Sequence, residues 1–103
     1  MSNKYILEGR ETRPVSLEEW AKWFETGNRR VGQDTVGDKL VSTVFLGLDH
    51  SFGEPRPILF ETMVFPHGSW SEEYCARYST YNEAEAGHKA VVEALQKGEP
   101  LPC

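Results

Sequence analysis

Residues 40–48 read LVSTVFLGL, and this stretch decides the fold. Its β-branched and aromatic residues occupy both alternating faces, which is typical of a strand that is covered on both sides or nearly so. Gly37 and Asp38 lie just before it, and a Gly-Asp pair between two extended segments predicts a tight two-residue hairpin. The polar segment 29–36 is then its antiparallel partner. Gly47, inside the run, predicts a bulge or a close approach of another segment.

Further strands are expected on either side of this hairpin. The segments 58–65 and about 72–78 have strand-like patterns, and the connection 49–57 contains two prolines that cannot join a central ladder. Along 58–65, Glu61 shares a face with large apolar side chains, so a charge is expected among apolar neighbours. Residues 5–7 predict a short first strand, followed by a turn and an extended path.

A first helix is predicted over 17–26, because complete start signals precede an amphipathic pattern. Ser16 is the expected N-cap, and Glu19 completes a capping box with it. Gly27 then predicts a left-handed stop at the C-terminus. The expected buried stripe has the spacing of a core-facing helix and consists of Leu17, Trp20, Ala21 and Phe24.

A second helix is predicted after the last strand. Thr80 is its expected N-cap and Glu83 completes another capping box, while Gly98 and Pro100 end the helix. On its apolar face, His88 is expected to be hydrogen-bonded beneath the sheet rather than to act as a ligand. The predicted buried stripe is Tyr81, Ala84, His88, Val91 and Leu95.

The expected order of elements is β-α-β-β-β-β-α. It predicts the α+β class, with an antiparallel sheet of four to five strands and two helices packed on one of its faces. Residues 1–98 are expected to form this single domain, and residues 99–103 a flexible C-terminal tail. The length of 103 residues and the apolar content of 39% suit one core of this size.

The charge and the cysteines of the chain exclude several classes of partner. Lys and Arg total 11 and Asp and Glu total 16, which gives a net charge of −5 and argues against binding a nucleic acid backbone. Two cysteines, Cys75 and Cys103, are too few for a secreted disulfide scaffold. No apolar run is long enough to span a bilayer. We therefore expect a cytoplasmic protein with reduced thiols and no membrane role.

Five stretches of the chain carry a resemblance: VSTVFLGLDHSFG at 41–53, LFETMVF at 59–65, WAKWFE at 20–25, YST at 78–80 and EAEAGH at 83–88. Through them most of the chain resembles a family of small uncharacterised proteins from phages and bacterial prophages. At 54–57 this chain reads EPRP where the family often has a glycine-rich stretch, so that loop is expected to differ in shape. The resemblance implies a bacterial host, and it implies no particular activity, cofactor or catalytic residue.

Four side chains are candidates for acid/base chemistry. Asp49 and His50 leave the central strand at its end. Glu61 lies in the next strand and His67 in the loop after it, so an enzyme hypothesis has the four converge on one edge of the sheet. The alternative is that Asp and His at a strand end are turn formers and loop anchors, which is the commoner case. No pair has a metal-ligand spacing and no glycine-rich phosphate loop occurs, so neither a metal nor a cofactor is expected.

Aromatic side chains outside the predicted core are the second kind of candidate. Trp23, Phe52 and Trp70 fall on predicted edges or loops, and exposed rings anchor many protein interfaces. An equal alternative is that these rings fill the core of a small sandwich. Arg56, in the long connection, is a candidate contact for an anionic ligand, as are Arg29, Arg30 and Arg77. The commoner alternative is that adjacent arginines after a helix end only interact favourably with the helix dipole.

These observations favour a non-enzymatic interaction protein. We expect it to bind a host or phage protein in the bacterial cytoplasm, and the phage context of the resemblance suggests inhibition of a host defence component. The alternatives are a small hydrolase-like enzyme with its site at the Asp49 and His50 edge, or a small-ligand-binding protein with its pocket between sheet and helices. The extended segment 29–36 is also an edge able to pair across the axis of a homodimer.

Overall fold

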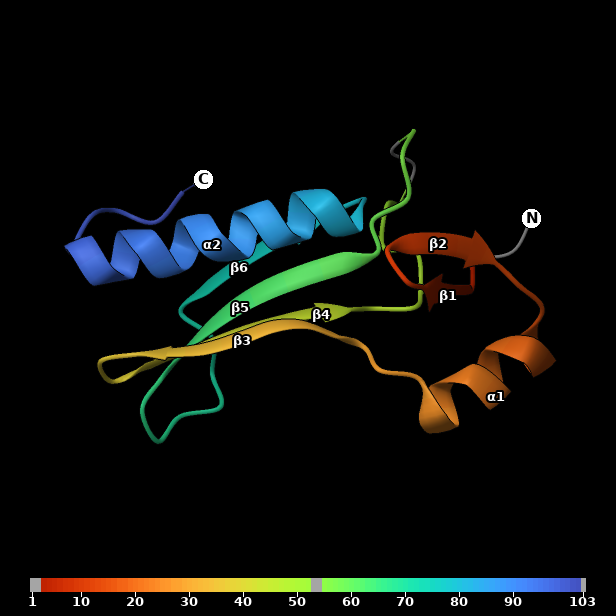
Figure 1. Ribbon diagram of the computed structural model, residues 1–103, viewed down its shortest axis with the longest axis horizontal. Helices are drawn as coiled ribbons and strands as arrows, with labels where there is room; N and C mark the ends of the chain where they lie inside the picture. The colour runs from red at the N-terminus through yellow and green to blue at the C-terminus, as the bar shows by residue number, and fades with distance from the viewer. Residues whose placement is uncertain (1–2, 53–54, 103) are drawn as a thin grey trace.

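A computed structural model describes residues 3–52 and 55–102. Its main element is a four-stranded antiparallel sheet in the order β3-β4-β5-β6, in which each strand pairs with its neighbour in sequence (Figure 1). The predicted α+β class and antiparallel sheet are therefore confirmed. The strands are β3 (Arg30–Val36), β4 (Lys39–Phe45), β5 (Phe60–Pro66) and β6 (Tyr74–Tyr78).

Strand β4 is central, as its sequence predicts. A two-residue turn at Gly37 and Asp38 joins it to β3, and Gly37 has a φ of +60°, which glycine adopts without steric cost. The strand ends at Phe45, before the apolar run does, because Gly47 at φ +78° turns the chain out of the ladder. Its fully buried side chains are Val41, Thr43 and Phe45.

The second helix, α2 (Tyr81–Lys97), covers one face of the sheet and contacts all four strands (Figure 1). Thr80 and Glu83 form the predicted capping box, and Gly98 at φ +69° ends the helix in the left-handed conformation. The predicted stripe is confirmed, although Tyr81 and Leu95 are only half-buried. The buried side chains of α2 are Ala84, His88, Val91 and Ala94.

Two apolar clusters fill the space between α2 and the sheet. One consists of Phe45, Leu59, Phe60 and Ala84, and the other of Val41, Val64 and Val91. The buried polar side chains Thr43, Thr62 and His88 lie between these clusters. Since burying one large apolar side chain contributes about 1.5–3 kcal/mol, the two clusters hold α2 firmly on the sheet.

The N-terminal segment differs from the expected single strand and extended path. Strands β1 (Tyr5–Glu8) and β2 (Glu11–Pro14) form a separate two-stranded antiparallel sheet. The order of elements is therefore β-β-α-β-β-β-β-α, because the extended path turns back and pairs with the first strand. A bridge between Lys4 and Leu48 joins this hairpin to the chain beyond β4.

The first helix, α1 (Leu17–Thr26), does not lie on the face of the four-stranded sheet as expected. It lies beyond one end of that sheet, beside the β1-β2 hairpin, and none of its side chains is fully buried (Figure 1). Leu17 is 62% exposed, and Ala21 of the predicted stripe is exposed as well. The side of α1 that packs against the fold consists instead of Trp20, Trp23 and Phe24.

Gly47 explains the position of α1. The indole Nε1 of Trp20 donates to the Gly47 carbonyl over 3.0 Å, and a Cβ at Gly47 would lie 2.2 Å from the ring of Phe24. The predicted close approach at Gly47 is thus confirmed. The predicted left-handed stop at Gly27 is wrong, because its φ is −69°. Glycine fits at that position for another reason, since a Cβ would lie 2.4 Å from the ring of Trp23.

The N-terminus of α1 has only half of the predicted capping box. The hydroxyl of Ser16 accepts from the backbone N–H of Glu19 over 3.2 Å. The Glu19 carboxylate pairs with Arg13 over 2.6 Å. This side chain therefore ties α1 to β2 instead of closing the box.

The C-terminal residues lie against the fold instead of forming a loose tail. Leu101 packs on the cluster around Val91, and the Tyr74 hydroxyl donates to the carbonyl of Pro102 over 2.5 Å. Cys103, the last residue of the expected tail, lies outside the described residues. The packed part of the chain thus extends past the boundary expected at residue 98.

Candidate functional site

The four candidate acid/base residues do not form one cluster. Asp49 and His50 follow the end of β4, and His67 follows the end of β5. Because these two strands are antiparallel and pair along their whole length, their C-terminal ends lie at opposite ends of the sheet, about 20 Å apart. Glu61 lies near the Asp49 end but bonds to β6. The structure therefore does not bring the four side chains together.

Asp49 is a loop anchor. Its Oδ1 accepts the backbone N–H groups of Ser51 over 2.8 Å and of Ile58 over 3.0 Å. Burial by itself would raise the pKa of this carboxyl, but the hydrogen bonds from Ile58 and Ser51 stabilise the charged form more, and the pKa lies below its usual value. The neighbouring His50 makes a ring contact with Phe52 at a centroid distance of 6.3 Å. Asp49 thus fixes the shape of the β4-β5 connection.

Glu61 is paired within the sheet. Its side chain is buried on the face opposite α2, and its Oε2 accepts from Arg77 Nε over 2.8 Å and from Cys75 Sγ over 3.3 Å. Burial, and next the Glu61 carboxylate, raise the pKa of the Cys75 thiol, so the thiol stays protonated at neutral pH. Glu61 is thus the charged residue that the sequence predicts on this strand, and its ion pair with Arg77 joins β5 to β6.

A polar network lies beneath α2, and the sequence pattern predicts only its central residue, His88. The Nδ1 of His88 lies 2.7 Å from Thr43 Oγ1, and its Nε2 lies 2.7 Å from a carboxylate oxygen of Asp34. Thr43 Oγ1 is also hydrogen-bonded to Oγ1 of Thr62. Because a carboxylate only accepts, we assign the proton to Nε2, and Nδ1 then accepts from Thr43. The expected hydrogen-bonded position of His88 is confirmed.

This network contains the residue types of a catalytic nucleophile, base and acid. The hydroxyl groups that would act as the nucleophile are, however, not accessible to a substrate. Thr43 and Thr62 are both 0% exposed, so no substrate atom reaches their hydroxyls, whereas the Asp34 side chain is 54% exposed. Within the described residues, no buried side-chain nitrogen or oxygen lacks a hydrogen-bond partner. The network is therefore a satisfied part of the core that ties α2 to the sheet.

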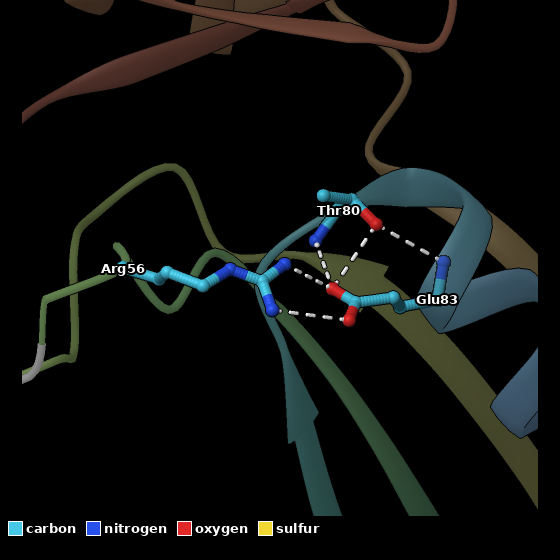
Figure 2. A network of polar contacts seen from close by, with 3 residues as sticks. All are labelled: Arg56, Thr80 and Glu83. Carbon is cyan, nitrogen blue, oxygen red and sulfur yellow. Dashed lines mark hydrogen bonds and ion pairs between the residues drawn. The ribbon is translucent and has the colours of Figure 1, made fainter.

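Arg56, the candidate contact for an anion, is engaged inside the molecule (Figure 2). Its two terminal nitrogens donate to the two carboxylate oxygens of Glu83, over 2.7 and 3.3 Å. The backbone N–H and the hydroxyl of Thr80 donate to the same carboxylate, over 3.2 and 3.1 Å. The Arg56 guanidinium holds the pKa of Glu83 below its usual value. The network thus fastens the long connection to the N-terminus of α2.

The three candidate aromatic side chains have different surroundings. Trp23 packs edge-on against Phe45, with ring centroids 5.5 Å apart, so it belongs to the core and not to a surface patch. Phe52 and Trp70 are 90% and 87% exposed. They lie in the β4-β5 and β5-β6 connections, at opposite ends of the sheet (Figure 1). Phe52 and Trp70 therefore belong to two separate surfaces.

Within the described residues, no helix covers the face of the sheet opposite α2, which we call the open face (Figure 1). Cross-strand pairing arranges its side chains in rows. The row nearest the β3-β4 turn is Thr35, Leu40 and Phe65, the next is Gln33, Ser42, Met63 and Cys75, and the third is Arg30, Val44, Glu61 and Arg77. The apolar members of these rows, Leu40, Val44, Met63 and Phe65, are only half-buried. The open face is therefore an amphipathic surface in contact with solvent.

Trp70 stands beside the first of these rows. A hollow of about 310 Å³ opens there, which we call the Trp70 hollow. The rings of Trp70 and Phe65 meet edge to face in it, with centroids 6.2 Å apart. The row of Thr35, Leu40 and Phe65 forms its floor, and Asp38, His67 and Trp70 lie around it.

In the part of the chain that the structure describes, no three His, Cys, Asp or Glu side chains are grouped to hold a metal ion. No helix among residues 3–52 and 55–102 is long and apolar enough to cross a membrane. The sequence matches no family model, no curated protein and no solved structure.

Proposed function

We propose that this chain is a protein-docking module whose binding surface is the open face at its Trp70 end. The observation that carries the proposal is the 87% exposure of Trp70 beside the half-buried side chains of Leu40 and Phe65. Burying a large aromatic side chain is strongly favourable, and tryptophans surrounded by apolar side chains dominate the binding energy of many interfaces. The position of Trp70 therefore supports contact with a partner.

The charge of the chain indicates a partner with a basic surface. The net charge is −5. Asp38 lines the Trp70 hollow and Glu72 lies two residues from Trp70, and both side chains are exposed. Complementary charge orients and accelerates docking. We propose a bacterial host protein in the cytoplasm as the partner, in keeping with the resemblance to phage and prophage proteins, and we propose that docking inhibits it by covering its surface.

The other hypotheses receive less support. The candidate acid/base residues Asp49 and His67 lie at opposite ends of the sheet, and the hydroxyl of Thr43 is closed to substrate. Strand β3 is an edge of the sheet, as the dimer hypothesis requires, and pairing of this edge with a second copy stays a prediction.

The test compares two exposed aromatic side chains at opposite ends of the sheet. Trp70→Ser and Phe52→Ser each remove one ring that lies outside the core, so both variants are expected to fold. Tagged full-length chains are used to capture partners from bacterial lysate at low and at high salt. We expect one stoichiometric partner that the wild type and Phe52→Ser retain and that Trp70→Ser loses, with release at high salt. Capture of no partner, or of one that Trp70→Ser retains, contradicts the proposal.

A further inference from the structure

We propose that the Trp70 hollow receives a cationic side chain, arginine or lysine, of the protein partner. This inference rests on the proposed docking function and specifies the chemistry at the centre of the contact. Groups of two kinds that attract a cation, an aromatic pair and a carboxylate, meet in the hollow above an apolar floor.

The aromatic pair is Trp70 with Phe65. A cation within about 6 Å of a ring centroid is attracted by the electron-rich face of the ring, and tryptophan is the strongest partner of this kind. The chain uses the same contact internally, since the Arg10 guanidinium lies 4.7 Å over the ring of Tyr81. Among the described residues, neither lysine nor arginine lies over Trp70. This ring is thus open to a cation from another molecule.

The carboxylate is that of Asp38, in the β3-β4 turn. It is exposed, lines the hollow, and has no hydrogen bond or ion pair within the described part of the chain. The adjacent Lys39 is paired with Glu73. The hydrogen bond to Glu73, and to a smaller degree the charge of Asp38, raise the Lys39 pKa, so the Lys39 ammonium is bound to Glu73 and not to Asp38. No lysine or arginine lines the hollow. With His67 counted as neutral, as in the net charge of the chain, Asp38 makes the lining charge negative, which favours a cation and disfavours an anion.

The floor suits the stem of a long side chain. Leu40 and Phe65 offer a half-buried apolar surface, and Thr35 continues it toward the outer edge of β3. Arginine and lysine lay their methylene groups along apolar surface while the charged end stays at the polar rim. A hollow of about 310 Å³ holds one such side chain. The arrangement of floor, rings and carboxylate thus matches the whole side chain and not only its charge.

The first experiment uses a matched pair of small ligands. N-acetyl-arginine amide and N-acetyl-citrulline amide have nearly the same shape, but only the arginine compound is charged. Each is titrated into the full chain, and binding is followed by nuclear magnetic resonance at the Trp70 indole N–H and at the amides of Asp38 and Phe65. We expect a saturable shift of these signals with the arginine compound, and binding at least about threefold weaker with the citrulline compound. Equal binding of the two, or no shift at Trp70, overturns the inference.

A matched pair of variants separates the hollow from the overall charge. Asp38→Asn and Glu25→Gln each remove one exposed carboxylate, but Glu25 lies on α1, outside the hollow. We expect Asp38→Asn to weaken binding of the arginine compound at least about threefold and Glu25→Gln to leave it unchanged. Equal effects of the two variants overturn the role of Asp38.

The two proposals fail in different ways. If the lysate experiment yields a Trp70-dependent partner but the hollow does not prefer the arginine compound, the docking function stands and the cationic contact is wrong. If the hollow prefers the arginine compound but no Trp70-dependent partner is captured, the cationic site stands and protein docking is wrong.

Discussion

The imidazole Nε2 of His88 lies 2.7 Å from the carboxylate of Asp34, and this contact joins the middle of α2 to the outer strand β3. The same ring reaches Thr43 of β4 through Nδ1, and Thr43 is hydrogen-bonded to Thr62 of β5. One helix residue is thus connected, directly or through a hydroxyl, to three neighbouring strands. Such a buried and fully satisfied network fixes how the helix sits on the sheet.

Replacement of His88 by leucine is expected to lower the free energy of unfolding by about 2–4 kcal/mol. Leucine leaves the hydroxyl of Thr43 without its acceptor in a buried site, whereas Asp34, whose side chain is 54% exposed, loses its donor but stays in contact with water. Urea unfolding followed by circular dichroism measures the loss. Asp34→Asn keeps an oxygen that accepts from the same N–H, so it is the control and is expected to cost less than about 1 kcal/mol. A loss below about 0.5 kcal/mol for His88→Leu would show that the network does not stabilise the fold.

Two glycines with nearly the same φ angle test how α1 is attached. Gly47 and Gly68 have φ values of +78° and +75°, but only at Gly47 would a Cβ collide with a side chain, 2.2 Å from Phe24. Gly68→Ala is expected to cost about 1 kcal/mol through backbone strain alone. Gly47→Ala is expected to cost about 2–3 kcal/mol more, because Phe24 must move. Thermal unfolding of both variants gives the comparison, and equal losses would contradict the close contact between α1 and Gly47.

The stability of the chain is expected to depend on pH through Asp49, whose pKa is lowered in the folded state. A lowered pKa means that the stabilisation is complete above about pH 4 and is lost as the pH falls through the folded-state value. Asp49→Asn keeps an acceptor but no charge, and it is expected to be about 1 kcal/mol less stable at pH 7. That difference should shrink toward pH 3. Urea unfolding of both proteins at several pH values checks this, and a difference independent of pH would assign the loss to shape and not to charge.

Cys75 is expected to react with iodoacetamide more slowly than an exposed thiol with an ordinary pKa does. Its raised pKa, caused first by burial and then by Glu61, reduces the thiolate fraction. Glu61→Gln should speed alkylation at pH 8 about two- to tenfold, because the amide removes the negative charge but keeps the acceptor. The rates are measured by mass spectrometry in a Cys103→Ser background, with Glu18→Gln on the distant α1 as the control of equal charge change. Equal rates in the two variants would exclude an effect of Glu61.

The parts of the fold that could be predicted depend on local signals. The Gly37-Asp38 turn, the capping box at Thr80 and the stop at Gly98 act within a few residues of the chain, and each is found where the sequence places it. The position of α1 depends on a distant contact with Gly47, which helix periodicity does not encode. For this reason the predicted stripe includes Leu17, which is exposed, and omits Trp23, which packs on the core.

The candidate site could be predicted only in part. The exposure of Trp70 agrees with its loop sequence. The convergence of Asp49 and His67 fails because successive antiparallel strands end at alternate ends of the sheet. The Trp70 hollow combines Asp38 and Phe65 with Trp70, and only the register of three strands places them together.

The His88 network is also a product of register. Gly32, Thr43 and Thr62 occupy one cross-strand row beneath α2, and a Cβ at Gly32 would lie 3.0 Å from the imidazole. A small residue in that row was a usable sign that a ring of α2 approaches the sheet. That sign can be used only when it is known which residues of neighbouring strands are opposite one another. The alternation of polar and apolar residues along a single strand does not show this.

Helix α1 is attached to the rest of the chain by half-buried rings, whereas α2 is held by fully buried side chains. Its amide protons should therefore exchange with solvent through local opening events, at a free energy well below that of global unfolding, while those of α2 exchange only when the sheet unfolds. A protease added under native conditions would then cut first between residues 17 and 29. The fragment that survives would be the four strands with α2. The N-terminal part of the chain would thus be degraded sooner than the part that contains the four-stranded sheet, in the same solution.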